Sequence, residues 1–335
     1  MANIKITDTT LRDGSHSVTH QFSLDEIRRI TQALDETGID IIEVGHGDGL
    51  QGSTCNYGFS KESELDMIRM AVKTAKKAQI AILLIPGIGT VPDLEKVHNL
   101  GAQVVRVATH VTEADISAQH IIAAKQMGFF VVGFLMMAHR APVDTVVTEA
   151  LKMESYGADV VYATDSAGAM LPEDVRARVS ALRAALRVPV GFHAHNNLGL
   201  AIGNSLAALD AGATYIDGSL GGLGAGAGNA ATETLIAVLK RREISINSNL
   251  YTAIDSCSQV LRPILEGHGI HAPNMQDPLM LGYAGVYSSF MLHAKRAAKR
   301  FNVDYRDIIL EAGRREAVGG QEDWLYEIAE NISKA

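Results

Sequence analysis

Short runs rich in Val, Ile and Leu alternate along the chain with longer amphipathic segments, and this alternation recurs about eight times. The apolar runs are Ile4–Asp8, Ile39–Val44, Gln79–Ile85, Val104–Ala108, Phe129–Met136, Val160–Thr164, Pro189–Ala194 and Tyr215–Ser219. A nearly continuous β-branched composition is typical of parallel strands that are covered on both faces. The runs therefore predict eight buried parallel strands.

The segments between these runs have the periodicity of surface helices. They include Leu24–Thr37, Glu62–Lys76, Asp115–Met127, Pro172–Leu186 and Gly199–Ala211. In ETGID, NLGAQ, QMGFF, SYGAD and DAGAT, a glycine stands just past a helix, where a left-handed backbone favours a residue without Cβ. Eight strand–helix units predict an α/β fold, a closed (β/α)₈ TIM barrel, in preference to an open doubly wound sheet.

The pattern changes after the last predicted strand. The barrel should close with a helix near Glu233–Arg241, which places a catalytic barrel domain at residues 1–246. The remaining residues, 247–335, show helical periodicity and few strand signals. We expect helices at Tyr251–Leu265, Ser288–Phe301 and Tyr305–Arg315, which together form a C-terminal helical extension.

Composition narrows the class of protein. The chain has 335 residues, 47% of them apolar, and a formal net charge of −8, which offers no basic footprint for nucleic acid. No run is long enough to span a membrane, and MANIKITDTTLRDG lacks the apolar core of a secretory signal. Cys55 and Cys257 are too few for a disulfide framework and fit no zinc spacing, so we expect unpaired thiols and a cytoplasmic protein.

Polar residues gather where the predicted strands end, which is where TIM barrels carry their catalytic groups. TLRDGSH follows the first strand, Glu43 lies on the second, and the last three strands run into ATDSAG, GFHAHNN and SLGGLGAGAGN. His193 and His195 are two residues apart on a strand, so both imidazoles face one mouth of the barrel. With Asp13 they form a set suited to a divalent metal. The alternative is a pair of ordinary packed histidines.

Arg12, Asp13 and His16 lie within five residues of one another. A local ion pair between Arg12 and Asp13 is one interpretation. We favour another, in which Asp13 binds the metal and Arg12 faces a substrate oxygen that becomes negative in the transition state. His16 is then the candidate general base, with His20 as a competitor farther from the pair.

The segment Gly221–Gly228 is rich in glycine but does not match a dinucleotide fingerprint. It could bind phosphate through backbone amides. We favour a loop that passes close to a metal site, because it continues into Asn229 and Glu233, polar residues suited to holding the ligands in place.

Three motifs, TLRDG-S-H, HAHNN and GAGAGN, resemble the metal-dependent pyruvate aldolase–lyase superfamily of TIM barrels, which includes isopropylmalate and citramalate synthases and hydroxymethylglutaryl-CoA lyase. Longer stretches resemble the 4-hydroxy-2-oxovalerate aldolase family: EVGHGDGLQGST, NYGFS, PGIGTV, RVATH, GFLMMAH, KMESYGADVVY, GYAGVYSSF and VGGQED. The resemblance covers essentially the whole chain, the helical extension included. It implies a carbon–carbon lyase.

The resemblance also implies roles for individual residues. Asp13, His193 and His195 would bind a divalent ion, Mn²⁺ foremost, with Mg²⁺, Co²⁺ or Zn²⁺ as alternatives. Arg12 would stabilise a pyruvate enolate, and His16 would be the catalytic base. Ser166 would bind the substrate carboxylate, and Arg12 and His193 would contact the substrate. Tyr287 would lie near the 4-hydroxyl group, with Tyr283 as the weaker candidate. Glu43 and Asn229 would hold the other groups in place.

The implied reaction is a class II retro-aldol cleavage of 4-hydroxy-2-oxovalerate to pyruvate and acetaldehyde in aromatic catabolism. One rival is a Claisen-type synthase that joins an acyl-CoA to a 2-oxo acid on the same metal. Another is a barrel that binds without turnover, which the complete set of active-site residues disfavours. The resemblance implies an acylating acetaldehyde dehydrogenase docking on the C-terminal helices, and we expect an oligomer. The stretch Gly267–Gln276 leaves substrate size open.

Overall fold

The computed structural model describes residues 4–271, 276–286, 288–318 and 321–334. Its internal contacts divide the chain into two compact units, Met1–Ile270 and His271–Ala335. Buried apolar side chains form a cluster inside the first unit and another inside the second. The two units therefore have separate hydrophobic cores.

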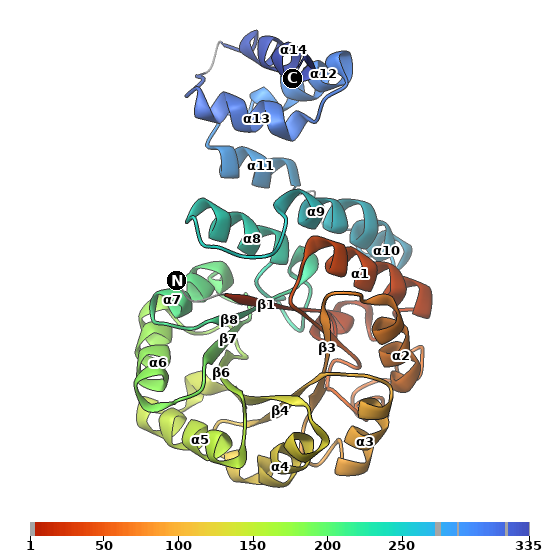
Figure 1. Cartoon of the computed structure of the whole chain (residues 1–335), viewed down its shortest axis with the longest axis vertical. Coiled ribbons are helices and arrows are strands. Elements are labelled where there is room, and N and C mark those ends of the chain that lie inside the picture. Colours follow the sequence, from red (N-terminus) through yellow and green to blue (C-terminus); the bar gives the residue numbers. More distant parts are fainter. Residues whose placement is uncertain (1–3, 272–275, 287, 319–320, 335) are drawn as a thin grey trace. The chain divides into compact units, whose positions relative to one another are not determined.

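Eight parallel strands form a closed barrel in which neighbours in the chain are neighbours in the sheet and β8 pairs with β1 (Figure 1). The strands are β1 (Lys5–Leu11), β2 (Ile41–Val44), β3 (Gln79–Leu84), β4 (Val104–His110), β5 (Phe130–Met136), β6 (Val160–Asp165), β7 (Val190–Ala194) and β8 (Tyr215–Gly218). This confirms the predicted (β/α)₈ barrel. β1 continues beyond its predicted end as far as Leu11, so Arg12 and Asp13 follow directly at its carboxyl end.

Helices surround the barrel (Figure 1). They are α1 (Leu24–Thr37), α2 (Glu64–Thr74), α3 (Val91–Asn99), α4 (Ala118–Met127), α5 (Val143–Tyr156), α6 (Pro172–Ala185), α7 (Ala201–Asp210) and α8 (Thr232–Arg241). α1 begins with a capping box, in which the Ser23 backbone donates to Glu26 at 2.7 Å and the Ser23 hydroxyl accepts from the Glu26 backbone. The five predicted helix-end glycines all have positive φ, between 84° and 111°.

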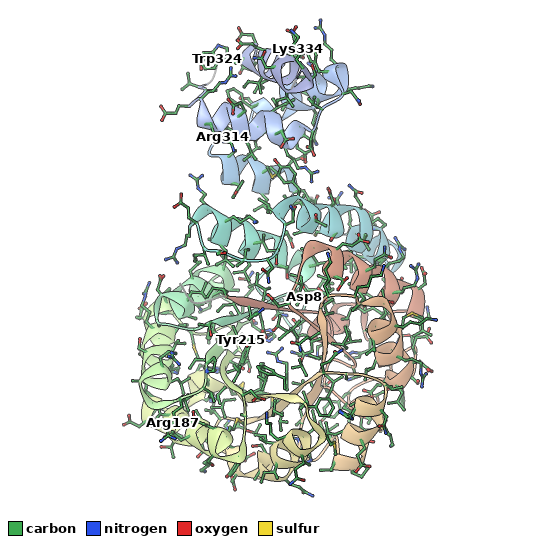
Figure 2. All side chains as sticks on the ribbon, viewed as in Figure 1. Asp8, Arg187, Tyr215, Arg314, Trp324 and Lys334 are labelled. Carbon is green, nitrogen blue, oxygen red and sulfur yellow. The ribbon has the colours of Figure 1, made fainter. Side chains whose placement is uncertain are left out.

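The inside of the barrel is filled by side chains (Figure 2). Because residues two apart on a strand share a face, each strand carries an alternating set of inward residues. On β2 and β4 the inward residues change from apolar Ile41 and Val104 to charged Glu43 and Arg106 toward the carboxyl end. On β8 the inward residue changes in the same direction from Tyr215 to the charged Asp217. A buried layer of charge therefore lies beneath the carboxyl end of the barrel.

The first unit ends later than the predicted boundary between residues 246 and 247. After the barrel come α9 (Leu250–Asp255), a π-helix (Ser256–Leu261) and α10 (Arg262–Gly267), all of which belong to the first unit. Their apolar residues Ala253 and Leu261 are buried, and the hydroxyl groups of Thr37 and Ser256 lie 3.1 Å apart. These helices cover α1 and α8, so the change of unit falls after Ile270.

The second unit is helical, with α11 (Gln276–Ala284), α12 (Phe290–Phe301), α13 (Tyr305–Arg314) and α14 (Trp324–Lys334). α12 and α13 match two of the expected helices, whereas α11 and α14 were not predicted. Leu325 and Ile328 of α14 are fully buried in the core of this unit. The described helices include none with the length and apolar composition of a transmembrane span. Neither cysteine forms a disulfide bond with a described residue; Cys55 is exposed and Cys257 is buried.

Candidate active site

The predicted metal ligands meet at the carboxyl end of the barrel. Ligand atoms of Asp13, His193 and His195 all lie within 4.8 Å of one another, and the three residues are buried. His195 Nε2 is 3.9 Å from Asp13 Oδ2. Burial and the neighbouring His193 lower the pKa of His195 to about 4. His195 is thus neutral near pH 7, the form in which imidazole binds a metal.

His193 is held by a carboxylate. Its Nδ1 lies 2.8 Å from Asp217 Oδ2. Burial alone would raise the pKa of Asp217, but Arg106 beside it holds that pKa below its usual value, so Asp217 is an ionised acceptor. An imidazole that donates from Nδ1 to a carboxylate presents Nε2 with a free electron pair, which is the usual arrangement of a metal-binding histidine.

Asn229 supports the same group. Its Nδ2 donates to Asp13 Oδ2 at 2.6 Å and to the Leu223 carbonyl at 2.9 Å. Its Oδ1 is buried and has no hydrogen-bond partner among the described residues. A buried oxygen without a donor beside one carboxylate and two imidazoles fits a site built for a cation. The side chains present therefore suit a divalent metal.

The glycine-rich loop passes close to this group, as the favoured interpretation of its sequence predicted. A Cβ on Gly224 would lie 2.4 Å from Asn229 Nδ2 and 2.7 Å from Asp13 Oδ2. Glu233, at the start of α8, accepts a hydrogen bond from the Gly221 amide at 3.1 Å. The loop thus needs glycine at position 224, and Glu233 fixes the loop at its other side.

Arg12 lies between two carboxylates. Its Nε donates to Glu43 Oε2 and its Nη1 to Asp13 Oδ1, each at 2.8 Å. Burial alone would lower the pKa of Arg12, but Glu43 and Asp13 raise it above its ordinary value. Burial would likewise raise the pKa of Asp13, which Arg12 and the two histidines hold well below its usual range. The ion pair is present, and it fixes a charged guanidinium beside the predicted metal ligands.

His16 lies in the short 3₁₀-helix Asp13–Val18 and is half-buried. Its ring packs on Gly47, where a Cβ would approach Nε2 to 2.3 Å. His20 is buried behind it, with ring centroids 4.8 Å apart, and stacks on His46 at 3.8 Å. Burial and these neighbours lower the pKa of His20 to about 4, and Ser15 Oγ lies 3.0 Å from its Nδ1. His20 therefore supports the ring of His16, which is the more accessible of the two.

Two predicted substrate contacts have different outcomes. Ser166 follows β6 at the same end of the barrel, is half-buried, and accepts a hydrogen bond from the Met137 amide at 3.0 Å. Tyr287 lies outside the described residues, so its role stays a prediction. Tyr283 is on α11 in the second unit. The structure thus brings Arg12, Asp13, Glu43, His16, Ser166, His193, His195 and Asn229 to the carboxyl end of the strands.

Two buried charged residues of the site, Arg106 and Asp217, were not predicted from the sequence. Arg106 on β4 donates to Glu43 Oε2 at 3.0 Å and to Asp217 Oδ2 at 2.5 Å. Arg106 is the only charged residue in the strand VVRVATH, and Asp217 is the only one in YIDG. A lone charge within a predicted buried strand was the available signal, because burying a charge is costly unless it is paired.

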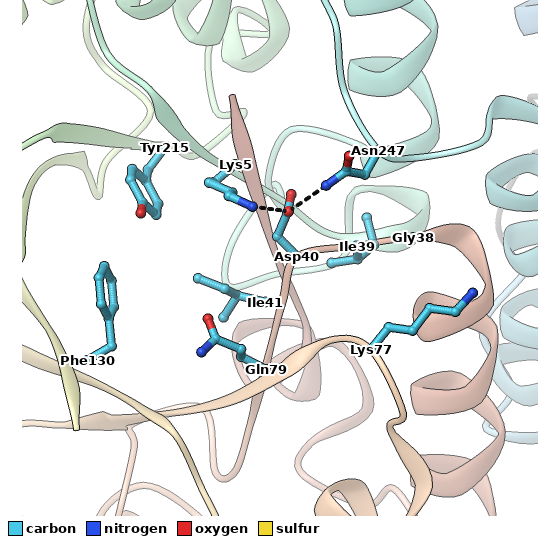
Figure 3. Close-up of a pocket in the computed structure, with 10 residues that line it drawn as sticks. All are labelled: Lys5, Gly38, Ile39, Asp40, Ile41, Lys77, Gln79, Phe130, Tyr215 and Asn247. Carbon is cyan, nitrogen blue, oxygen red and sulfur yellow. Dashed lines mark hydrogen bonds and ion pairs between the residues drawn. The ribbon is translucent and has the colours of Figure 1, made fainter. Parts of the chain in front are cut away.

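A cavity of about 510 Å³ opens at the opposite end of the barrel, where the strands begin (Figure 3). It is lined by Lys5, Gly38, Ile39, Asp40, Ile41, Lys77, Gln79, Phe130, Tyr215 and Asn247. Asp40 accepts hydrogen bonds from Lys5 at 2.8 Å and from Asn247 at 3.1 Å (Figure 3). None of the predicted site residues lines it, and charges at this end of a barrel usually serve stability.

Comparison with known proteins identifies the family. The HMGL-like family profile matches residues 3–260, and the DmpG-like communication domain matches residues 274–334. A 4-hydroxy-2-oxovalerate aldolase from Bacillus thuringiensis (strain Al Hakam) is 54% identical over 331 residues, which cover 99% of this chain and 96% of the relative. The chain belongs to the 4-hydroxy-2-oxovalerate aldolase family.

Membership of this aldolase family confirms the resemblance and makes the protein a carbon–carbon lyase. A second family member, from Chloroflexus aggregans (strain MD-66 / DSM 9485), is 55% identical over 98% of this chain and 95% of its own. Among solved structures, the Bacillus subtilis HMG-CoA lyase is 21% identical with a TM-score of 0.70, covering 82% of this chain and 96% of its own. The carboxyl transferase domain of Rhizobium etli pyruvate carboxylase is 16% identical with a TM-score of 0.70, covering 99% and 60%. These two share the fold.

Proposed function

We propose that this protein cleaves 4-hydroxy-2-oxovalerate to pyruvate and acetaldehyde in the catabolism of aromatic compounds, using a divalent metal ion. The observation that carries the proposal is the convergence of Asp13, His193 and His195 beside the buried guanidinium of Arg12. Relatives that are 54% and 55% identical over nearly the whole chain are named 4-hydroxy-2-oxovalerate aldolases. Site and family therefore support one reaction.

Asp13, His193 and His195 would hold the ion through one carboxylate oxygen and two imidazole nitrogens. Two imidazoles and one carboxylate leave coordination positions free for a 2-oxo acid. A bound divalent ion supplies Lewis acidity toward the 2-oxo group. We propose Mn²⁺ as the ion, and analysis of the metal content of the purified protein distinguishes it from Mg²⁺, Co²⁺ and Zn²⁺.

The remaining steps fall to side chains of this chain. His16 takes the proton of the 4-hydroxyl group as the C3–C4 bond breaks, and acetaldehyde leaves. The electron pair of that bond forms the pyruvate enolate, whose oxygen faces the fixed charge of Arg12. Ser166, half-buried at the end of β6, binds the carboxylate end of the substrate. A proton from water added to C3 then gives pyruvate, and protonated His16 returns its proton to the solvent.

The second unit is the proposed docking surface for an acylating acetaldehyde dehydrogenase. Acetaldehyde is reactive, so an enzyme that consumes it on the spot would protect the cell. The match of residues 274–334 to the DmpG-like communication domain supports this assignment. On α12, Leu292 is 55% exposed. Gel filtration of the two proteins together should give one complex, which Leu292→Arg weakens, and separate elution under all conditions would contradict the proposal.

The test follows pyruvate through lactate dehydrogenase during incubation of the Mn²⁺-loaded protein with 4-hydroxy-2-oxovalerate. Wild-type protein should release pyruvate, and His16→Ala should be slower by about 10²–10⁴-fold. His98→Ala, an exposed histidine on α3, is the matched control and should keep the wild-type rate. Absence of pyruvate together with thiol release from acetyl-CoA and a 2-oxo acid would instead establish the Claisen-type synthase.

A further inference from the structure

Arg106 is a buried cation that the proposed mechanism does not use. It is 1% exposed and lies on β4 between Val104 and Ala108, two residues of the barrel interior. Its guanidinium carbon lies 4.4 Å from the centre of the Phe134 ring and 4.8 Å from that of Tyr162. The aromatic rings thus hold the guanidinium in place inside the barrel.

Arg106 joins two strands that are not its neighbours. In the closed barrel, β8 lies opposite β4, and β2 is separated from β4 by β3. Nη2 donates to Asp217 Oδ2 on β8 at 2.5 Å, and Nη1 donates to Glu43 Oε2 on β2 at 3.0 Å. A guanidinium offers two donors in a rigid fork, whereas a lysine ammonium is a single point charge.

The same two oxygens also hold active-site residues. Glu43 Oε2 accepts from Arg12 Nε at 2.8 Å, and Asp217 Oδ2 lies 2.8 Å from His193 Nδ1. Glu43 therefore links Arg106 to Arg12, which faces the enolate in the proposed mechanism. Asp217 links Arg106 to the proposed metal ligand His193. A shift of its guanidinium would move both carboxylates and, through them, Arg12 and His193.

We infer that Arg106 is a positioning residue that couples the metal-binding half of the site, through Asp217 and His193, to the enolate-binding half, through Glu43 and Arg12. The inference rests on the proposed function for the identity of the two halves. Without this cation, Glu43 would keep only Arg12 as a partner and Asp217 only His193, and the negative charge left uncompensated inside the barrel would be strongly unfavourable. Arg106 both balances them and fixes the distance between them.

The test is Arg106→Lys, which keeps the charge and removes the fork. Two dissociation constants are measured: Mn²⁺ by electron paramagnetic resonance of the free ion, and oxalate, a planar analogue of the pyruvate enolate, on the Mn²⁺-saturated protein. Both should rise at least about tenfold, as expected when residues behind metal ligands are changed. Arg178→Lys is the control, because Arg178 binds the backbone carbonyls of Ala138, His139 and Ala141 and should leave both constants within twofold.

The partner variants separate the two halves. Asp217→Asn should weaken Mn²⁺ binding, and Glu43→Gln should weaken oxalate binding. Because Arg106 acts on the metal through Asp217, adding Arg106→Lys to Asp217→Asn should change the Mn²⁺ constant by less than about threefold. If Arg106→Lys does not fold, Glu43→Gln and Asp217→Asn are combined, and their effects on oxalate binding to the Mn²⁺-saturated protein should be non-additive.

Unchanged constants in Arg106→Lys would overturn the inference. So would an Arg106→Lys effect of full size in the Asp217→Asn background, or additive effects of the two partner variants. A wild-type protein that binds Mn²⁺ but releases no pyruvate would contradict the proposed function alone, since the Mn²⁺ constants still decide the role of Arg106. A wild-type protein that binds no Mn²⁺ would overturn both.

Discussion

At the amino-terminal ends of the strands, Lys5 and Asp40 pair beside an open cavity, with the Lys5 side chain 34% exposed. Asp40 also accepts from the Ile6 amide at 3.0 Å, so its carboxylate is well satisfied. At the carboxyl-terminal ends, the side chains of Arg12 and Asp13 are 6% and 5% exposed, and that of Glu43 is fully buried. One end of the barrel pairs its charges near water, and the other buries them.

The buried end is also incompletely satisfied. Among the described residues, Glu43 Oε1, Asp217 Oδ1 and Asn229 Oδ1 are buried without a hydrogen-bond partner. Buried charges cost free energy that an apolar core of the same volume would not require. The carboxyl end therefore keeps buried charges that are available to a substrate at a cost in stability, whereas the charges of the amino end are paired near water.

The largest expected effect comes from changing Asp13, one of the proposed metal ligands. Asp13→Asn keeps the shape of the side chain but removes the charge that a divalent ion requires. Because a bound Lewis acid stabilises the transition state by several kcal/mol, the rate of pyruvate release should fall by at least about a thousandfold. Mn²⁺ binding and initial rates are measured together. Full activity in Asp13→Asn would contradict the proposal that the carboxyl end of the barrel binds a catalytic metal through Asp13.

A smaller loss should follow from crowding the same site. Gly224→Ala places a methyl group 2.4 Å from Asn229 Nδ2 and 2.7 Å from Asp13 Oδ2. One of these groups must move, so the Mn²⁺ dissociation constant should rise about 10–100-fold. Gly203→Ala on α7 is the matched control: its new methyl meets nothing within 4 Å. That control should bind Mn²⁺ normally and gain about 0.5–1 kcal/mol of stability. Equal affinities in the two variants would contradict the tight loop.

The carboxyl end should also make the metal-free protein sensitive to acid. The pKa of His20 is lowered to about 4 by burial and by His46, so it stays neutral in the folded state while the unfolded chain takes up a proton below about pH 6.5. Stability should therefore fall as pH falls from 6.5 toward 4. The test variant is His20→Asn, because asparagine tolerates the left-handed backbone at φ 62°. Between pH 7 and pH 5, the free energy of unfolding measured with urea should fall by about 2 kcal/mol less in this variant than in the wild type. Parallel pH profiles would argue against this linkage.

The smallest effect is expected at the amino end. Asp40→Asn breaks the pair with Lys5, which is partly exposed and therefore contributes little, so the free energy of unfolding should fall by about 1 kcal/mol. Mn²⁺ affinity and the rate of pyruvate release should stay within twofold of wild type. A large loss of activity in Asp40→Asn would contradict the claim that catalysis depends on the carboxyl end and not on the amino end.

Much of the site was predictable because its groups sit at strand ends or follow strand periodicity. His193 and His195 share a face by the two-residue repeat, and Asp13 follows the first strand. Arg106 and Asp217 were missed because their bond joins residues 111 positions apart across the barrel, inside runs that are otherwise apolar or uncharged. Strand composition fixes that a side chain is buried, but not which strand it reaches.

The fold was predictable to a similar depth. Eight strand–helix units imply a closed barrel whatever their exact ends. The boundary after residue 246 differed from the division after Ile270 because periodicity shows that the segment Leu250–Gly267 is helical without showing what it packs against. α14 went unpredicted although its Leu325 and Ile328 form part of a core, which only the assembled helices reveal.

Whether the carboxyl end of the barrel holds a catalytic metal is tested by titrating the metal-free protein with Mn²⁺ while bound metal and pyruvate release from 4-hydroxy-2-oxovalerate are measured on the same samples. We expect no pyruvate without metal, a linear rise that ends at one Mn²⁺ per chain, and neither binding nor activity in His193→Ala. Pyruvate release at the full rate from metal-free protein, or an unchanged titration in His193→Ala, would contradict this expectation.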